Sequence, residues 1–238
     1  MAEIAVPYPA SSVALVRPAA KGSFEVYMNR RPAEMDTYAG VYVFPGGRVE
    51  ESDCSEKMLS LTAGLTPREA QATLGVEFSP ELCLGYWVAA ARELFEEAGI
   101  HFFVPQGNST LSVGRRLMAE LAQMRPVLQR GELDFATMLS SANLYCDLGP
   151  LAYFYHRVTP EHYRVRFDAR FYVAALPPEQ TPLHASEEVS ESVWLSPEEA
   201  LERFESGRFP MMPPTLMVLR KLSNYPSWPA LQAALQLR

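Results

Sequence analysis

Residues 79–99 contain the strongest folding signal in this 238-residue chain. Ser79 is a good N-cap, Pro80 suits the first helical position, and Gly99 is the residue type that most readily adopts the left-handed conformation after a helix. These signals predict a helix over residues 80–98. Its apolar residues form one stripe that must pack against a core: Cys83, Leu84, Trp87, Ala91, Leu94, Phe95 and Ala98.

The opposite face of this helix carries three glutamates close together. Side chains three and four positions apart share a helical face, which groups Glu93, Glu96 and Glu97. Like charges at this spacing weaken a helix by about 0.2–0.5 kcal/mol per pair. A solvated face with an Arg92 to Glu96 pair would tolerate that cost, and divalent cations, which bind carboxylate oxygens, would relieve it. These residues alone leave both interpretations open.

A glycine turn, Phe44-Pro45-Gly46-Gly47, lies upstream and is typical of the end of a strand. With this turn, the sequence resembles the Nudix hydrolases. The box of that family is a glycine, five residues, Glu, seven residues and then Arg-Glu-U-x-Glu-Glu-x-Gly-U, with U aliphatic. Residues 92–100 match every fixed position of the second half, and Gly47 matches the leading glycine.

The sequence departs from the box at two places. Asp53 replaces the first glutamate, and the spacer extends over 38 residues, from Cys54 to Ala91, instead of seven. A long insertion here, with the glycine turn and the following aspartate, resembles the subgroup of mitochondrial and peroxisomal coenzyme A diphosphatases. The resemblance covers the chain from the first strand to about Thr215.

The resemblance implies roles for the box residues. Glu93, Glu96 and Glu97 would be catalytic residues that hold Mg²⁺ or Mn²⁺, and the carbonyl of Gly46 would complete the metal shell. Arg92 would pair with a box carboxylate and hold the loop to the helix. The remaining motif positions are Gly47, Asp53 and Gly99. Asp53 either replaces the glutamate of the family or only caps and orients the loop.

The general base is not fixed by the box. Relatives often use an acidic residue from a late loop, and a glutamate six residues before a tryptophan recurs among them. Glu188 stands in that place before Trp194 and is the first candidate, with Glu187 and Glu191 as the others. The alternative is a charged surface loop.

Three arginines are candidate substrate-binding residues: Arg31, Arg48 and Arg166. In the coenzyme A subgroup, an arginine near the end of the second strand is expected close to the substrate. Strand alternation places Arg166 on one face with Asp168 and Arg170, which favours either a buried ion-pair network or a phosphate-binding surface. The four histidines have no metal-ligand spacing and are expected on the surface or in packing roles.

The order of predicted elements favours an α/β (α+β) fold, a mixed sheet sandwiched between helices as in the Nudix family. Expected strands cover residues 11–17, 24–29, 41–44, 100–104, 151–158, 165–176 and 189–195. One domain, residues 1–238, would include a helical insertion at about 54–78, a second helical block at about 111–142 and C-terminal helices at about 197–237.

The two helical blocks have local signals of their own. Thr66-Pro67-Arg68-Glu69 is a capping box, so two short helices fit the insertion at 54–78. That insertion would be a solvent-facing elaboration, or a lid or dimer surface. The block at 111–142 would be broken at Pro126 and Gly131 and would hang over one edge of the sheet. Ser196-Pro197-Glu198-Glu199 forms a second capping box.

Composition excludes several classes of function. A net charge of -7 argues against sequence-independent binding of nucleic acid. Three widely spaced cysteines without a CxxC pair argue against a disulfide framework or a zinc site. No run approaches the roughly 18 uncharged residues of a membrane helix, so a cytoplasmic protein without a membrane partner is expected. A homodimer is a candidate assembly.

The residues and the resemblance together predict a metal-dependent diphosphatase. Its partner would be a small nucleoside diphosphate derivative, with coenzyme A or acyl-coenzyme A first. A nucleotide sugar, a dinucleotide or a modified nucleotide is the alternative substrate. A ligand-sensing domain without catalysis is the alternative from another class, and the intact box carboxylates argue against it.

Overall fold

The computed structural model describes residues 4–33, 39–107, 114–183 and 189–237. Its centre is a mixed sheet with the strand order β10-β2-β1-β9-β8, to which β3 adds beside β2 and β4 beside β1. Among the described strands of this sheet, only β1 and β9 pair in parallel. The strands of this sheet are β1 (Tyr8–Pro18), β2 (Phe24–Arg30), β3 (Tyr42–Val43), β4 (Gly46–Arg48), β8 (Ala152–Val158), β9 (Phe167–Ala175) and β10 (Glu191–Leu195).

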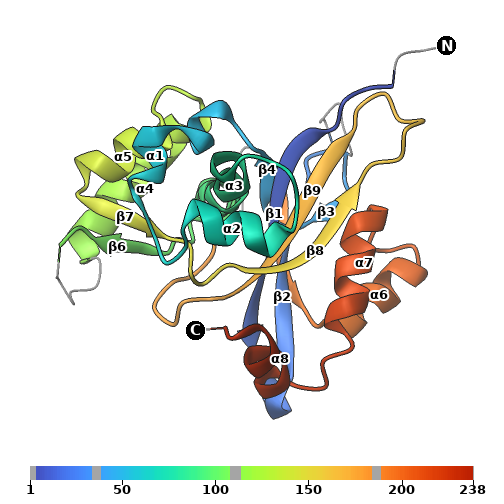
Figure 1. Ribbon diagram of the computed structural model, residues 1–238. Helices are drawn as coiled ribbons and strands as arrows, with labels where there is room; N and C mark the ends of the chain where they lie inside the picture. The colour runs from blue at the N-terminus through green and yellow to red at the C-terminus, as the bar shows by residue number, and fades with distance from the viewer. Residues whose placement is uncertain (1–3, 34–38, 108–113, 184–188, 238) are drawn as a thin grey trace.

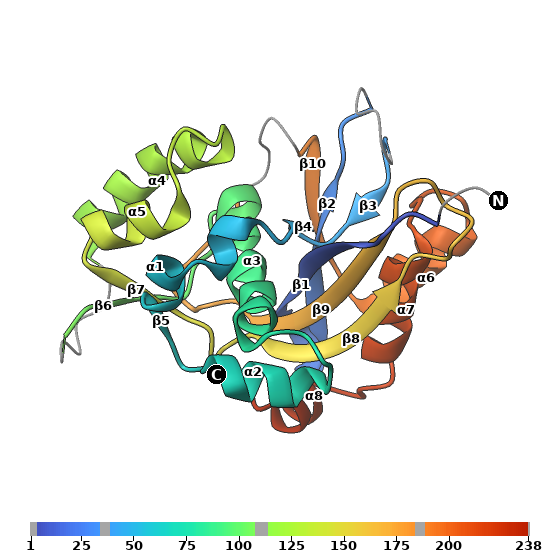
Figure 2. The same cartoon turned by 45° about the horizontal axis from the view of Figure 1, so that its top comes forward.

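Helices cover both faces of the sheet, which confirms the predicted architecture (Figure 1). The layer of α3 lies on one face and the layer of α6 and α7 on the other, while α8 lies beside the β1–β2 end (Figure 2). The α-helices are α1 (Glu56–Leu59), α2 (Pro67–Leu74), α3 (Pro80–Ala98), α4 (Arg115–Gln129), α5 (Phe135–Ser141), α6 (Pro197–Glu205), α7 (Pro213–Leu222) and α8 (Trp228–Leu235). The described residues also form two short 3-10 helices, η1 (Ala20–Gly22) and η2 (Glu51–Cys54).

Helix α3 has the predicted bounds. The Ser79 side chain accepts a hydrogen bond from Leu82 N, and Gly99 has a φ of +70°. A side chain at Gly99 would also meet Leu183, because an added Cβ would lie 3.1 Å from Leu183 Cδ1. Gly99 therefore ends the helix and leaves room for the segment that packs beneath it.

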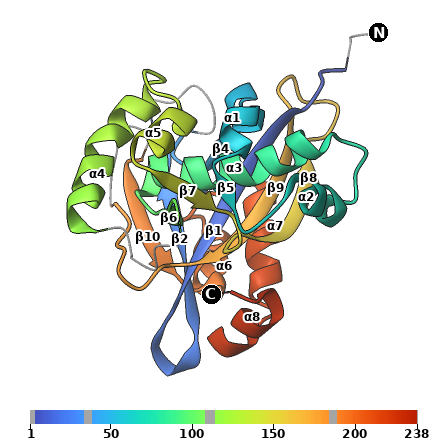
Figure 3. The same ribbon diagram turned by 60° about the vertical axis from the view of Figure 1, so that its left-hand side comes forward.

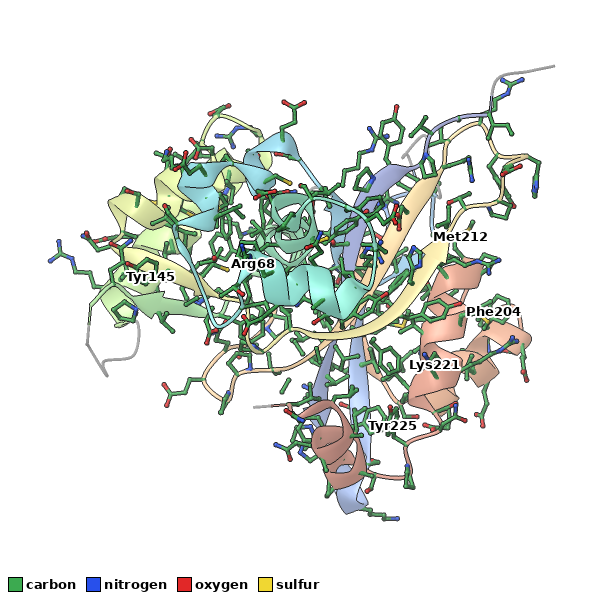
Figure 4. All side chains as sticks on the ribbon, viewed as in Figure 1. Arg68, Tyr145, Phe204, Met212, Lys221 and Tyr225 are labelled. Carbon is green, nitrogen blue, oxygen red and sulfur yellow. The ribbon has the colours of Figure 1, made fainter. Side chains whose placement is uncertain are left out.

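Alternation along the strands divides the core into two layers. Val13 and Leu15 of β1 face α3, whereas Ala14 and Val16 face α6 and α7. The second layer continues to β8, where the Lys221 ammonium lies 5.2 Å from the ring centroid of Phe154 (Figure 4). Packing of Val13 and Leu15 against α3 holds this helix on the sheet and thereby positions its glutamates.

A second, three-stranded sheet was not predicted. It consists of β5 (Thr62–Ala63), β7 (Leu144–Asp147) and β6 (Phe103–Pro105) and lies beside α3, together with α4 and α5 (Figure 3). The run predicted as a strand at 100–104 therefore contributes only β6, and to this sheet rather than to the main one. Strands of two and four residues lack a sequence period, and their pairing partners are distant in the chain.

The two helical blocks differ from prediction in two ways. The insertion at 54–78 forms α1 and α2, and the capping box at Thr66 is present. This insertion is part of the core rather than a purely solvent-facing elaboration, since Met58 and Ala70 are buried in the same cluster as α3. Helix α4 also continues through Pro126, where the proline removes one backbone hydrogen bond of the helix.

No helix in the described parts of the chain is both long and apolar enough to span a membrane.

Candidate active site

Arg92 is the centre of the candidate site. This residue is 4% exposed, and its guanidinium contacts three carboxylates. Nη1 lies 3.0 Å from Glu93 Oε1 and 3.3 Å from Glu96 Oε2, while Nη2 donates to the carbonyl of Arg48 at 2.9 Å. The planar fork of arginine therefore joins α3 to the loop that follows β4, as predicted for Arg92.

Asp53 makes the strongest of these contacts. Its Oδ1 accepts from Arg92 Nε at 2.9 Å and its Oδ2 from Arg92 Nη2 at 3.0 Å. Oδ2 also accepts from the backbone N of Glu50 at 2.9 Å, inside a capping box at the start of η2. With two hydrogen bonds to Arg92 and 1% exposure, Asp53 ties the loop to α3.

Gly47 lies against Glu93. A Cβ built on Gly47 would be 2.1 Å from Glu93 Oε1, so no other residue fits without moving the carboxylate. The register of β4 with β1 fixes this approach, since Gly47 pairs with Ser11 and Gly46 with Ser12. The structure thus places the double-glycine turn directly against the acidic face of α3, as the resemblance implied.

Two of the glutamates are held in an environment that disfavours their charge. Burial raises the pKa of Glu93 to about 7, against the lowering effect of Arg92 and with a contribution from the charge of Glu96. Burial also raises the pKa of Glu96 to about 7, again opposed by Arg92. The positive charge of Arg92 therefore does not cancel the effect of burial on the pKa of these two carboxyls.

The third glutamate faces another way. Glu97 is 8% exposed, and its Oε2 accepts from Asn29 Nδ2 of β2 at 3.4 Å. Glu93 and Glu96 face Arg92 instead, so the three predicted ligands do not converge on one point. Among the described residues, no three His, Cys, Asp or Glu side chains are arranged so that they could hold a metal ion as they stand.

The donor set nevertheless fits a divalent cation in its chemistry. Carboxylate oxygens are the ligands that Mg²⁺ prefers, and Arg92 does not fully offset the rise that burial causes in the pKa of Glu93 and Glu96. The convergence that the sequence suggested requires Glu93 and Glu96 to rotate away from Arg92.

The helical block after β6 contacts the same turn of α3. Arg125 Nη1 and Gln129 Nε2 of α4 both donate to the backbone carbonyl of Glu96, at 2.5 and 2.8 Å. Beside these contacts lies a cavity of about 160 Å³ between η2, α3 and the α4–α5 block. It is lined by Glu50, Ser52, Arg92, Glu96, Leu128, Gln129, Gly131, Leu133, Asp134 and Phe135. The block packs on α3 as a wall of this cavity, not over an edge of the main sheet.

The three candidate substrate arginines lie in different settings. Arg31 begins the connection from β2 to β3, where its backbone N donates to Val41 O at 3.0 Å. Arg48 is exposed, and its guanidinium carbon lies 4.1 Å from the ring centroid of Tyr8. Arg166 is 8% exposed and donates to two backbone carbonyls, those of Thr159 and Ala5. The contacts of Arg166 are thus those of a structural residue.

The strand that follows Arg166 carries a buried ion pair, one of the two alternatives for this face. Arg170 is 1% exposed and its Nη2 lies 3.6 Å from Asp168 Oδ2. Its guanidinium carbon lies 4.7 Å from the ring centroid of Tyr86 on α3. These contacts hold α3 to the sheet.

The late acidic residues are only partly within the described structure. Glu187 and Glu188, the first candidate for the general base, lie outside the described residues. Glu191 begins β10 and accepts a hydrogen bond from the Tyr42 hydroxyl at 2.9 Å. The role of Glu188 therefore stays a prediction.

The histidines in the described regions have packing or surface roles, as expected. His101 stacks on Phe103 with 4.6 Å between ring centroids, and burial lowers the pKa of His101 to about 4. His156 is bonded to Asp168 at 2.6 Å, and His184 lies outside the described residues.

Comparison with known proteins agrees with this geometry. A sequence model described as the NUDT19 Nudix domain matches residues 4–222. The chain belongs to the Nudix hydrolase family. The Nudix hydrolase from Alicyclobacillus acidocaldarius has a similar structure, with a TM-score of 0.73, 25% sequence identity and 96% of each chain covered. The Nudix fold predicted from the sequence is thereby confirmed.

Two curated Nudix relatives bear the name acyl-coenzyme A diphosphatase NUDT19. The Gallus gallus protein is 28% identical over 237 residues, which covers 86% of this chain and 62% of the relative. The Xenopus laevis protein is 25% identical over 229 residues, which covers 85% and 60%. The chain thus spans about three fifths of the length of these relatives.

Three residues that contact the Nudix glutamates were not predicted from the sequence. Asn29, Arg125 and Gln129 come from β2 and α4, far from the box in the sequence. Asn29 had a usable signal, since it is a polar residue directly after the apolar run Val26-Tyr27-Met28 and shares a strand face with the inward-facing Tyr27. Arg125 and Gln129 had none, because an arginine and a glutamine four residues apart are ordinary on a helix surface.

The raised pKa values of Glu93 and Glu96 predict a pH-dependent response to Mg²⁺. Without metal, folding favours the protonated carboxyls, so this contribution to stability is fully present below about pH 4.5 and is lost as the pH rises through about 7. Mg²⁺ needs the ionised carboxylates and should bind more tightly at pH 8 than at pH 6. At 100 times its Kd, Mg²⁺ should stabilise the protein by about 2.7 kcal/mol, or about 5–10 °C in Tm.

Differential scanning calorimetry at pH 6 and pH 8, with and without Mg²⁺, measures this response. Glu120→Gln, which changes an exposed acid on α4, is the control and should keep the wild-type response. A Mg²⁺ shift of equal size at both pH values would contradict the prediction.

Proposed function

We propose that this protein hydrolyses the diphosphate linkage of a nucleoside diphosphate derivative with the help of Mg²⁺ or Mn²⁺. The observation that carries the proposal is the closure of the Nudix box, in which Gly47 lies against Glu93 and Arg92 joins Asp53 to the glutamates. The 38-residue spacer leaves this arrangement intact, because Asp53 and Arg92 meet across it.

Each group of the site would have a distinct task. Glu93, Glu96, Glu97 and the carbonyl of Gly46 would hold the cation. A bound divalent cation neutralises charge on the diphosphate and orients a water molecule for attack on phosphorus. Arg92 would fix the acidic face relative to the glycine turn, and Arg125 and Gln129 would hold the last turn of α3 through the carbonyl of Glu96.

Coenzyme A or an acyl-coenzyme A is the leading substrate. Support comes from the two relatives named acyl-coenzyme A diphosphatase and from the long insertion inside the box. Hydrolysis of coenzyme A would yield 4'-phosphopantetheine and adenosine 3',5'-bisphosphate. Water adds to one phosphorus and the bridging oxygen leaves with the other phosphate, so two phosphomonoesters form.

The test is a substrate panel with product analysis by liquid chromatography and mass spectrometry. It compares coenzyme A, an acyl-coenzyme A, a nucleotide sugar and a dinucleotide, each with Mg²⁺ and with EDTA. We expect Mg²⁺-dependent release of the two phosphomonoesters, with kcat/KM for the coenzyme A compounds at least 10-fold above that for the others. Faster hydrolysis of a nucleotide sugar or dinucleotide would overturn the substrate assignment. Tight binding without turnover of any compound would favour a ligand-sensing domain.

A further inference from the structure

Asn29 is an amide buried beneath the last turn of α3. It is 1% exposed, and its neighbours Tyr27 and Met28 on β2 are buried as well. Moving an amide from water to an apolar environment without hydrogen bonds costs about 2–7 kcal/mol, so buried amides nearly always have hydrogen-bond partners. The partners of Asn29 therefore indicate its role.

Those partners fix which way the amide points. Ser192 Oγ of β10 donates to Asn29 Oδ1 at 2.9 Å. Because Oδ1 is engaged on that side, it is Nδ2 that faces α3, where it donates to Glu97 Oε2 at 3.4 Å. The Tyr27 hydroxyl in turn lies 2.9 Å from Ser192 Oγ, and its single proton is shared between that oxygen and the carbonyl of Leu183, so the proton of Ser192 goes to Asn29.

The same network returns to α3. The Tyr27 hydroxyl also contacts the carbonyl of Leu183, and the backbone N of Leu183 donates to Ala98 O at 3.0 Å. Starting from Glu97, the bonds pass through Asn29, Ser192, Tyr27 and Leu183 and end at the residue next to Glu97. This closed circuit ties the last turn of α3 to β2, to β10 and to the segment at Leu183.

We propose that Asn29 is a positioning residue for Glu97, with Ser192 fixing the orientation of its amide. Asn29 is a neutral donor, so it can orient the carboxylate without neutralising the charge that a cation needs. Arg92 differs in this respect, since it brings a positive charge to Glu93 and Glu96. The inference rests on the proposed function, because it concerns the metal-binding face of that same site.

Four variants test the role of this network. Asn29→Leu keeps the size of the side chain and removes its donor, and Ser192→Ala removes the hydroxyl that fixes the amide. Ser192→Thr restores that hydroxyl. Ser190→Ala is the matched control, because Ser190 Oγ bonds the carbonyl of Arg30 near the same strand and lies outside the circuit.

Mg²⁺ affinity is measured on the substrate-free protein by isothermal titration calorimetry, alongside kcat and Tm. Loss of a partner that orients a metal ligand typically costs about 10–100-fold in affinity. We expect the Kd for Mg²⁺ to rise about 10-fold or more in Asn29→Leu and at least 3-fold in Ser192→Ala. Ser192→Thr and Ser190→Ala should stay within 2-fold of wild type.

The outcomes separate this inference from the proposed function. A folded Asn29→Leu protein with wild-type Kd and a lower Tm would mean a purely structural role and would overturn the inference. If Asn29→Leu does not fold, the pair Ser192→Ala and Ser192→Thr decides, and equal Kd values for the two would overturn it. Failure of the wild type itself to bind Mg²⁺ or to hydrolyse any panel compound would instead count against the proposed function.

Discussion

Glu97→Gln should lower kcat at saturating Mg²⁺ by about 100-fold or more. The change is isosteric and removes the charge of one proposed metal ligand. A divalent cation contributes several kcal/mol to stabilising the transition state, and about 2.7 kcal/mol corresponds to 100-fold in rate. Glu96→Gln should have a similar effect. Steady-state kinetics over a Mg²⁺ titration, on the best substrate of the panel, gives both values.

The control for this prediction is Glu120→Gln on α4, an exposed acid that pairs with Arg116. It should retain wild-type kcat within 2-fold. If Glu97→Gln keeps kcat within 3-fold of wild type, the carboxylate has no part in the chemistry, and the acidic face of α3 would then be structural.

Arg92→Met should remove about 3–5 kcal/mol from the free energy of unfolding. The variant keeps much of the side-chain volume but leaves Asp53 and Glu93 buried without their guanidinium partner. Because the unpaired carboxyls can take up protons, the loss should be smaller at pH 5 than at pH 8. Urea unfolding followed by circular dichroism at both pH values measures it.

Arg116→Met is the matched control for that loss. Arg116 is 94% exposed in its side chain and pairs with Glu120 at 3.1 Å. Exposed pairs of this kind contribute about 0–1 kcal/mol, so the control should barely change stability. An Arg92→Met variant that loses less than 1 kcal/mol would show that the buried carboxylates do not depend on this arginine.

The sequence predicts the parts of this fold whose signals are local. Helix α3 is bounded by Ser79 and Gly99, and both termini carry the residue types that helix ends require. The pairing of Arg92 with a box carboxylate was also foreseen, because the resemblance supplied it. The bidentate contact between Arg92 and Asp53 shows that an aspartate, although shorter than the glutamate of the family, can still join the loop to α3. The long spacer between the two residues does not prevent this contact.

The missed parts depend on contacts that are distant in the sequence. Strands β5 and β7 are too short to show a period and pair only because the chain brings residues 62–63 and 146–147 together. Asn29 reaches Glu97 through the stacking of α3 on the sheet. The convergence of the three glutamates was overestimated because helical spacing places side chains on one face without fixing their rotamers, and Arg92 attracts two of them.

The most direct test of the account is a Mn²⁺ titration followed by electron paramagnetic resonance. The titration compares wild type with the triple variant Glu93→Gln, Glu96→Gln, Glu97→Gln, which keeps the shape of the acidic face and removes its charge. The account predicts saturable Mn²⁺ binding by the wild type at pH 8 and none by the triple variant. Equal binding by the two proteins would show that the cation is held elsewhere and would contradict the account.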